Sequence, residues 1–158
     1  MATITNVDST ALRHAVRKLG AQAHEVATVK IVARVRSAAP VSTVTPTSVG
    51  RPGRLRDSIK AAPSVEVGLS VITVITAAVP YASFVDEGTS SHPIVGNPLL
   101  RFWWKGPNKG KRSRTGIYFF HRVNHPGTKP NRFWSKNVTG AAWGRALTEA
   151  VRGINVRA

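Results

Sequence analysis

The side chains that could perform acid–base chemistry are few and scattered. Among 158 residues there are seven Asp and Glu residues, at Asp8, Glu25, Asp57, Glu66, Asp86, Glu87 and Glu149. Only Asp86 and Glu87 are adjacent, and neighbouring side chains on a helix point in different directions. A pair of carboxylates that acts on one substrate must face it together. The spacing therefore argues against a paired-carboxylate enzyme. The absence of cysteine excludes thiol catalysis and cysteine-ligated zinc.

Two of the five histidines, His121 and His125, are four residues apart. On a helix this spacing would present both rings to one metal ion. Here His121 lies in a predicted strand and His125 precedes Pro126, and no Asp or Glu is near them in the sequence, so a structural turn is favoured over a metal site. We expect His92 to lie in a loop, and His14 and His24 to be surface or interface residues. The sequence predicts no catalytic residue, metal or cofactor, and therefore not an enzyme.

The net charge of +16 comes from 23 Lys and Arg residues against seven acids. Its densest segment has six basic residues: Arg101, Lys105, Lys109, Lys111, Arg112 and Arg114. Phe102, Trp103 and Trp104 adjoin them, and cations beside aromatic rings suit contact with single-stranded nucleic acid. Two other interpretations remain: a solvated loop whose alternate aromatics enter the core, or a loop that docks on an acidic protein. The solvated and docking interpretations are favoured over direct nucleic-acid contact.

The elements that must position these residues begin with a long helix. Apolar residues recur at intervals of three and four, at Leu12, Val16, Leu19, Ala23 and Val26, and less cleanly at Val29, Val32 and Val35. This pattern predicts an amphipathic helix over residues 9–38 that packs on a sheet and ends before Pro40. Three prolines and two glycines in residues 39–53 predict a long mobile loop. Residues 55–59 are expected to form a helical turn or lead into a strand.

Strand patterns follow. Residues 59–78 predict two strands with a turn near Gly68 or near Pro63. Residues 81–87 predict a short helix, anchored by Tyr81, Phe84 and Val85 and stopped by Gly88. Residues 99–104 and 116–123 predict a β-hairpin, and residues 105–114 form its basic hairpin loop. A last helix is expected from just after Asn131 to about Arg152.

This order predicts a single α+β domain over residues 1–158. We expect a small, mainly antiparallel sheet of about four strands, with the long N-terminal helix and the C-terminal helix packed on one face. No apolar run approaches the ~20 residues that span a bilayer, and the first residues form no secretory leader. We therefore expect no membrane partner, and either a soluble intracellular product or a particle assembled inside a cell.

Three short patches carry a more specific signal. The first is Gly-Arg-Leu-Arg-Asp-Ser-Ile at residues 53–59. The second is Pro-Tyr-Ala-Ser-Phe-Val-Asp-Glu-Gly-Thr at residues 80–89, followed by His-Pro-Ile at 92–94. The third is Val-Asn-His-Pro-Gly-Thr-Lys-Pro at residues 123–130. In this order they resemble the gene-product-ten-like family of tailed bacteriophages, whose members are described as tail-component, neck or tail-completion proteins.

The likeness spans about residues 10–150. Family members carry a Thr-Gly-x-Leu-Arg-x-Ser-Ile element, a Tyr-Ala-x-x-Val-Glu-x-Gly-Thr element with its acid at Asp86 here, and a His-Pro-Gly-Thr-Lys-Pro turn. The usual Pro-Val-Asp-Thr-Gly lead is altered, since about ten residues separate Pro40-Val41-Ser42-Thr43 from Gly53. The residues that carry the resemblance are Gly53, Leu55, Ser58, Ile59, Tyr81, Ala82, Phe84, Val85, Gly88, Thr89, His92, Pro93, His125, Pro126, Gly127, Lys129 and Pro130.

The resemblance implies a non-catalytic structural subunit of the head–tail connector. Such a subunit would form a homo-oligomeric ring, commonly hexameric, between head-completion proteins (adaptor or stopper) and the tail terminator or tail tube. It would be assembled in the host cytoplasm and located in the neck or tail of the virion, with non-specific contact to packaged DNA as a further expectation. The alternative function is a small basic nucleic-acid-binding protein that acts through residues 101–114.

Overall fold

The structure, a computed structural model, describes residues 9–41, 52–104 and 116–154. Its helices are α1 (Ser9–Ala38), α2 (Arg54–Ser58), α3 (Ala82–Glu87) and α4 (Gly140–Gly153). Its strands are β1 (Ile59–Ala61), β2 (Val65–Val67), β3 (Ser70–Ile72), β4 (Ile75–Ala77), β5 (His92–Trp104) and β6 (Gly116–His125). The α+β class with a long N-terminal helix, antiparallel strands and a C-terminal helix is confirmed. The predicted range of the first helix is also confirmed.

The strands form three antiparallel pairs rather than one four-stranded sheet: β1 with β4, β2 with β3, and β5 with β6. The first two pairs follow one another along a single long hairpin, which turns at Gly68 and Leu69. The turn predicted near Gly68 is therefore correct, and the alternative near Pro63 is wrong. Pro63 instead lies where the ladder is interrupted, because proline has no N–H to donate to a neighbouring strand.

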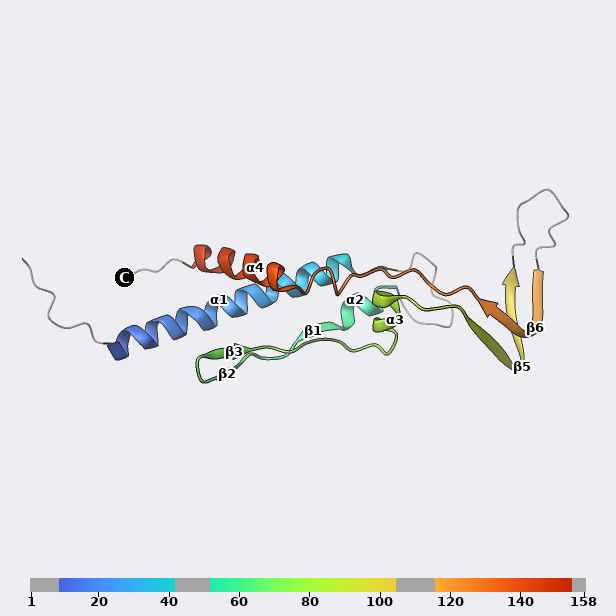
Figure 1. The fold of residues 1–158 in the computed structure, drawn as a ribbon, viewed down its shortest axis with the longest axis horizontal. Coiled ribbons are helices and arrows are strands. Elements are labelled where there is room, and N and C mark those ends of the chain that lie inside the picture. Colours follow the sequence, from blue (N-terminus) through green and yellow to red (C-terminus); the bar gives the residue numbers. More distant parts are fainter. Residues whose placement is uncertain (1–8, 42–51, 105–115, 155–158) are drawn as a thin grey trace, which may run out of the picture.

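The core lies where α1 meets α4 and the long hairpin. Small residues at intervals of four on α4 (Ala142, Ala146 and Ala150) are buried, as are Ala23 and Ala27 of α1, so the two helices approach closely. They run antiparallel (Figure 1). Half-buried His24 of α1 stacks on Trp143 of α4 at 5.5 Å between ring centroids and lies 3.0 Å from Thr73 Oγ1 of the hairpin. His24 is thus an internal contact of this body.

The C-terminal helix begins later than predicted. Residues 133–137 form turns, and α4 starts at Gly140. Thr139 is the N-cap, because its hydroxyl accepts a hydrogen bond from the backbone N–H of Ala142 at 3.1 Å. The helical pattern from Phe133 onward was misleading because Phe133 enters the core from a turn.

The β5–β6 hairpin projects from this body and occupies one end of an elongated molecule (Figure 1). Its strands extend beyond the predicted ranges, and His92 lies in a strand rather than in a loop. Between the pairs Val95–Arg122 and Leu100–Phe120 the register shifts, so four residues of β5 lie opposite one residue of β6. Such a bulge bends a ribbon.

The N-terminal half of α1 is less covered than its pattern predicts. Leu12 and Val16 expose 55% and 61% of their surface, whereas Ile31 and Val35 are buried. The reason is length, because α4 has 14 residues and α1 has 30, so α4 covers only part of the longer helix. Within the described ranges, no helix is long and apolar enough to cross a membrane.

Candidate interaction site

The second and third sequence patches join in a clasp at the base of the projecting hairpin. We define the clasp as Gly88, Thr89, Gly127 and Thr128. The backbone N–H of each threonine donates to the carbonyl oxygen of the other at 3.1 Å. Their hydroxyl oxygens are also 3.1 Å apart. Both glycines have positive φ, 77° at Gly88 and 85° at Gly127, which side chains other than hydrogen rarely tolerate.

The close approach of the two backbones is a second reason why positions 88 and 127 must be glycine. A Cβ on Gly88 would lie 2.4 Å from the carbonyl oxygen of Thr128, and one on Gly127 would lie 2.2 Å from that of Thr89. Lys129 and Pro130 also limit the space at Gly88. A Cβ there would lie 3.1 Å from the carbonyl carbon of Lys129 and 2.8 Å from the backbone nitrogen of Pro130. Two segments 39 residues apart therefore touch through their backbones.

Asp86 fixes the segment that follows the clasp. Its carboxylate accepts the backbone N–H of Trp134 at 2.7 Å and that of Ser135 at 3.3 Å, and its own carbonyl accepts the N–H of Arg132 at 3.0 Å. Asp86 is a buried acid, 9% exposed. These backbone donors explain why an acid lies here without catalytic partners.

The first patch anchors α2 to the core. Leu55 and Ile59 are buried, and Gly53 has a φ of 84° where the chain enters α2. The hydroxyl of Ser58 donates to the carbonyl of Leu55 at 2.7 Å. The guanidinium of Arg36 donates twice to the carbonyl of Ile59, at 2.9 and 2.7 Å. This patch thus ties the end of α1 to the start of the long hairpin.

The short helix α3 is present, and Gly88 follows it as predicted. Ala82 and Val85 pack against the core. The prediction that Phe84 anchors this helix is wrong, because Phe84 is 59% exposed, and Tyr81 is exposed as well. In a helix of only six residues, one side alone can face the core.

The patch histidines lie across the base of the projecting hairpin. His92 pairs with His125, and Pro93 pairs with Asn124; the two imidazole rings are 5.2 Å apart. His125 Nδ1 accepts the backbone N–H of Gly127 at 3.1 Å across Pro126, so the ring stabilises the local backbone. Within the described part of the chain, no three His, Cys, Asp or Glu side chains gather as a metal site would require.

Of the six basic candidates, Arg101 alone lies among the described residues; it is exposed on β5 and pairs with Phe119. Lys105, Lys109, Lys111, Arg112 and Arg114 lie outside the described residues. The interpretation that alternate hairpin aromatics enter the core is wrong for the described ones. Phe102, Tyr118 and Phe120 stack on each other, with centroids 5.4 and 6.3 Å apart, and are not among the core residues.

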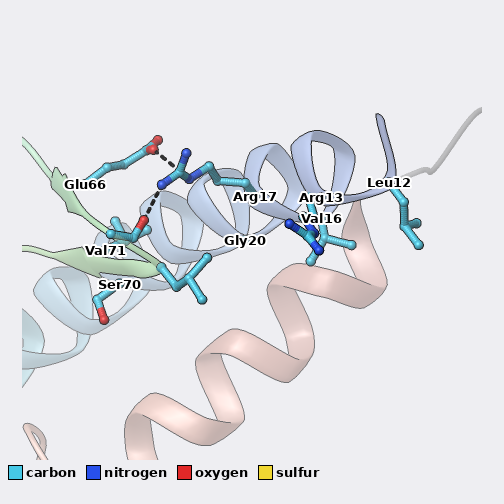
Figure 2. A pocket seen from close by; sticks show the side chains of 10 residues that line it. Leu12, Arg13, Val16, Arg17, Gly20, Glu66, Ser70 and Val71 are labelled. Carbon is cyan, nitrogen blue, oxygen red and sulfur yellow. Dashed lines mark hydrogen bonds and ion pairs between the residues drawn. The ribbon is translucent and has the colours of Figure 1, made fainter. Parts of the chain in front are cut away.

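A groove that the sequence did not reveal lies at the other end of the body (Figure 2). It lies between the N-terminal half of α1 and the turn of the long hairpin, and its volume is about 500 Å³. Its apolar lining includes Leu12, Val16 and Leu69, and Leu69 is 99% exposed. Arg17 closes one side by pairing with Glu66 at 3.7 Å and donating to the carbonyl of Gly68.

The helical pattern in the sequence assigns Leu12 and Val16 to the core. The signal in the sequence is the leucine that follows Gly68 in the predicted turn, a position where a polar residue is usual.

The pKa of Glu149 is shifted by the hydrogen bond that Lys30 donates and by the charges around it. Lys30 Nζ donates to Glu149 Oε2 at 2.8 Å and its charge attracts the carboxylate, which lowers the pKa of Glu149 below its ordinary value of 4.5. A lowered folded pKa stabilises the α1–α4 contact above the unfolded pKa, and that contribution is lost as the pH falls through the folded pKa. In an NMR titration we expect a Glu149 midpoint below 4.5 that rises in Lys30→Gln. An unchanged midpoint in that variant would contradict the assignment.

No protein-family model, no curated protein and no solved structure matches this chain. The family resemblance therefore depends on the patch residues themselves. Their geometry is that of a junction: the first patch lies at the end of α1, and the second and third meet at the base of the β5–β6 hairpin.

Proposed function

We propose that this protein is a structural subunit of a bacteriophage head–tail connector, acting by assembly rather than by catalysis. It would form a homo-oligomeric ring between head-completion proteins and the tail, in the neck of the virion. One observation carries the proposal. The residues that resemble the phage family hold an apolar hairpin away from the body, and the opposite end of the body has an open apolar groove.

The two ends of the molecule are unlike (Figure 1). A closed ring of identical subunits uses heterologous contacts, in which one surface of each copy meets a different surface of the next. An elongated subunit with separate apolar surfaces at its two ends meets that requirement. The resemblance implies a hexamer, adaptor or stopper proteins on one side, and a terminator or tube on the other.

The basic segment provides a test of the connector role. Reversing the charges of Lys109, Lys111 and Arg112 to Glu should impair head–tail joining or DNA retention, because a basic segment in a neck would contact acidic partners or the DNA backbone. The measurement is the yield of infectious, DNA-filled particles. The matched control reverses exposed Lys60, Arg145 and Arg152 on the body, an equal change of charge, and should retain the yield. Normal particles from the loop variant would contradict this role.

A second candidate function is that of a small basic nucleic-acid-binding protein. The observation in its favour is that exposed Arg101 and exposed Phe119 are cross-strand partners on the projecting hairpin, so a cation and an aromatic side chain share one face. Binding of free DNA by the isolated subunit, weakening steeply with added salt as counterion release requires, would favour this candidate, provided that no ring forms.

A further inference from the structure

The projecting hairpin has one face of stacked aromatic rings and a more exposed face, on which Arg101 lies opposite Phe119. Phe102, Tyr118 and Phe120 stack on one face. By strand alternation Ile117 and Phe119 lie on the other, where they are 46% and 59% exposed. Neither β5 nor β6 packs extensively on any other described element. An isolated two-stranded hairpin is marginally stable in water, so the open face needs a partner.

The groove beside α1 is lined by apolar side chains together with those of Arg13, Arg17 and Glu66. Leu12, Val16 and Leu69 give it an apolar lining, and its volume of about 500 Å³ accommodates the side chains of Ile117 and Phe119 together. The groove and the hairpin lie at opposite ends of the same molecule (Figure 1), so a hairpin reaches a groove only on another copy. Contact between groove and hairpin is therefore heterologous and repeats from copy to copy.

The available area sets the strength of this contact. The exposed parts of Leu12, Val16, Leu69, Ile117 and Phe119 amount to on the order of 550 Å² of apolar surface. About 57% of a typical interface is apolar, so complete burial of this surface corresponds to a contact of at most about 1,000 Å², the lower limit for a specific interface. Each pairwise contact is therefore weak, and a ring gains stability from the contact that closes it.

We propose that the open face of the β5–β6 hairpin of one copy, with Ile117 and Phe119, docks in the groove lined by Leu12, Val16 and Leu69 of the next copy. This contact is the subunit interface of the proposed ring and so rests on the proposed function. Each copy carries +16 charges, so like-charge repulsion opposes the contact. Added salt screens repulsion between exposed charges and should strengthen self-association, the opposite of its effect on DNA binding.

Cysteine cross-linking tests the contact, because the chain has no cysteine of its own. Val16→Cys and Phe119→Cys proteins are mixed at 0.5 M salt and oxidised. We expect a disulfide-linked dimer from the mixture and a ladder of covalent oligomers from the double variant. Neither single variant alone should give the dimer, since the contact joins unlike surfaces. Phe119→Cys mixed with Ala141→Cys, an exposed position on α4, is the matched control and should not cross-link.

Blocking the groove gives an independent readout. Gly20 lines it, and a Cβ there meets no atom within 4 Å, so Gly20→Leu fills the groove without disturbing the fold. It should weaken self-association at least tenfold in sedimentation equilibrium. Gly144→Leu on α4, where a Cβ also meets nothing within 4 Å, should leave self-association unchanged. Circular dichroism should show the same helix content in both variants as in the unaltered protein.

The outcomes separate this contact from the proposed function. A cross-link between positions 16 and 119, together with loss of association in Gly20→Leu, supports the contact. Oligomers that form without this cross-link and tolerate Gly20→Leu overturn the contact and leave the ring proposal intact. A protein that is monomeric under all conditions and forms no cross-link overturns both.

Discussion

Gly127→Ala and Gly88→Ala are each expected to destabilise the base of the projecting hairpin strongly. Alanine must adopt a φ of 85° or 77° there, and its Cβ would lie 2.2 or 2.4 Å from a carbonyl oxygen of the facing segment. The unfavourable φ alone costs about 1–2 kcal/mol. The clash forces the threonine pair apart, so we expect a total loss of about 3 kcal/mol. This is a large share of a typical stability of 5–15 kcal/mol.

A matched control isolates the clash. Gly68 also has a positive φ, 61°, but a Cβ there would meet no atom within 4 Å. Gly68→Ala should therefore lose only the conformational part, about 1 kcal/mol. Hydrogen exchange of the Thr89 and Thr128 amides, together with urea unfolding, measures both effects. Equal losses in Gly68→Ala and Gly127→Ala would mean that the close approach of the two patches contributes nothing.

Asp86→Ala is expected to have the second largest effect. Removal of the carboxylate leaves the backbone N–H groups of Trp134 and Ser135 without their acceptor. Trp134 is half-buried, and a buried donor left unpaired costs about 1–3 kcal/mol, whereas the N–H of exposed Ser135 can bond to water. We therefore expect a loss of about 2 kcal/mol in urea unfolding. The turn over residues 133–137 positions buried Phe133, so increased exchange at the Trp134 amide should accompany the loss.

The neighbouring acid provides the control for Asp86. Glu87 is exposed, and Glu87→Ala should change stability by less than about 0.5 kcal/mol. Asp86→Asn retains one acceptor oxygen and should fall between the two. If Asp86→Ala leaves stability unchanged but abolishes particle assembly, Asp86 contacts a partner rather than the backbone.

The sequence predicted the elements well where a local signal determined them. The first helix follows from the spacing of Leu19, Ala23 and Val26, and the short helix follows from its stop at Gly88. The start of the last helix was misplaced because the segment near Phe133 is held by Asp86, 48 residues away in the sequence. No local pattern contains that information.

At the candidate site, too, local signals were visible in the sequence and tertiary contacts were not. The sequence singled out Gly88 and Gly127, but their contact depends on tertiary structure, as the 2.2 and 2.4 Å approaches show. The groove was missed because an apolar stripe says which face of a helix is apolar, not how far along the helix a partner reaches. Leu12 and Val16 continue the stripe of the buried residues beyond the end of α4.

The most direct test of the account is the oligomeric state of the isolated protein as salt is raised, measured by sedimentation velocity with electron-microscopic images of the sample. We expect a single closed ring, at an integer multiple of the subunit mass, that becomes more populated with salt and is lost in Gly20→Leu. A monomer at every concentration and salt, bound to DNA with a steep salt dependence, would contradict it and favour the nucleic-acid-binding function.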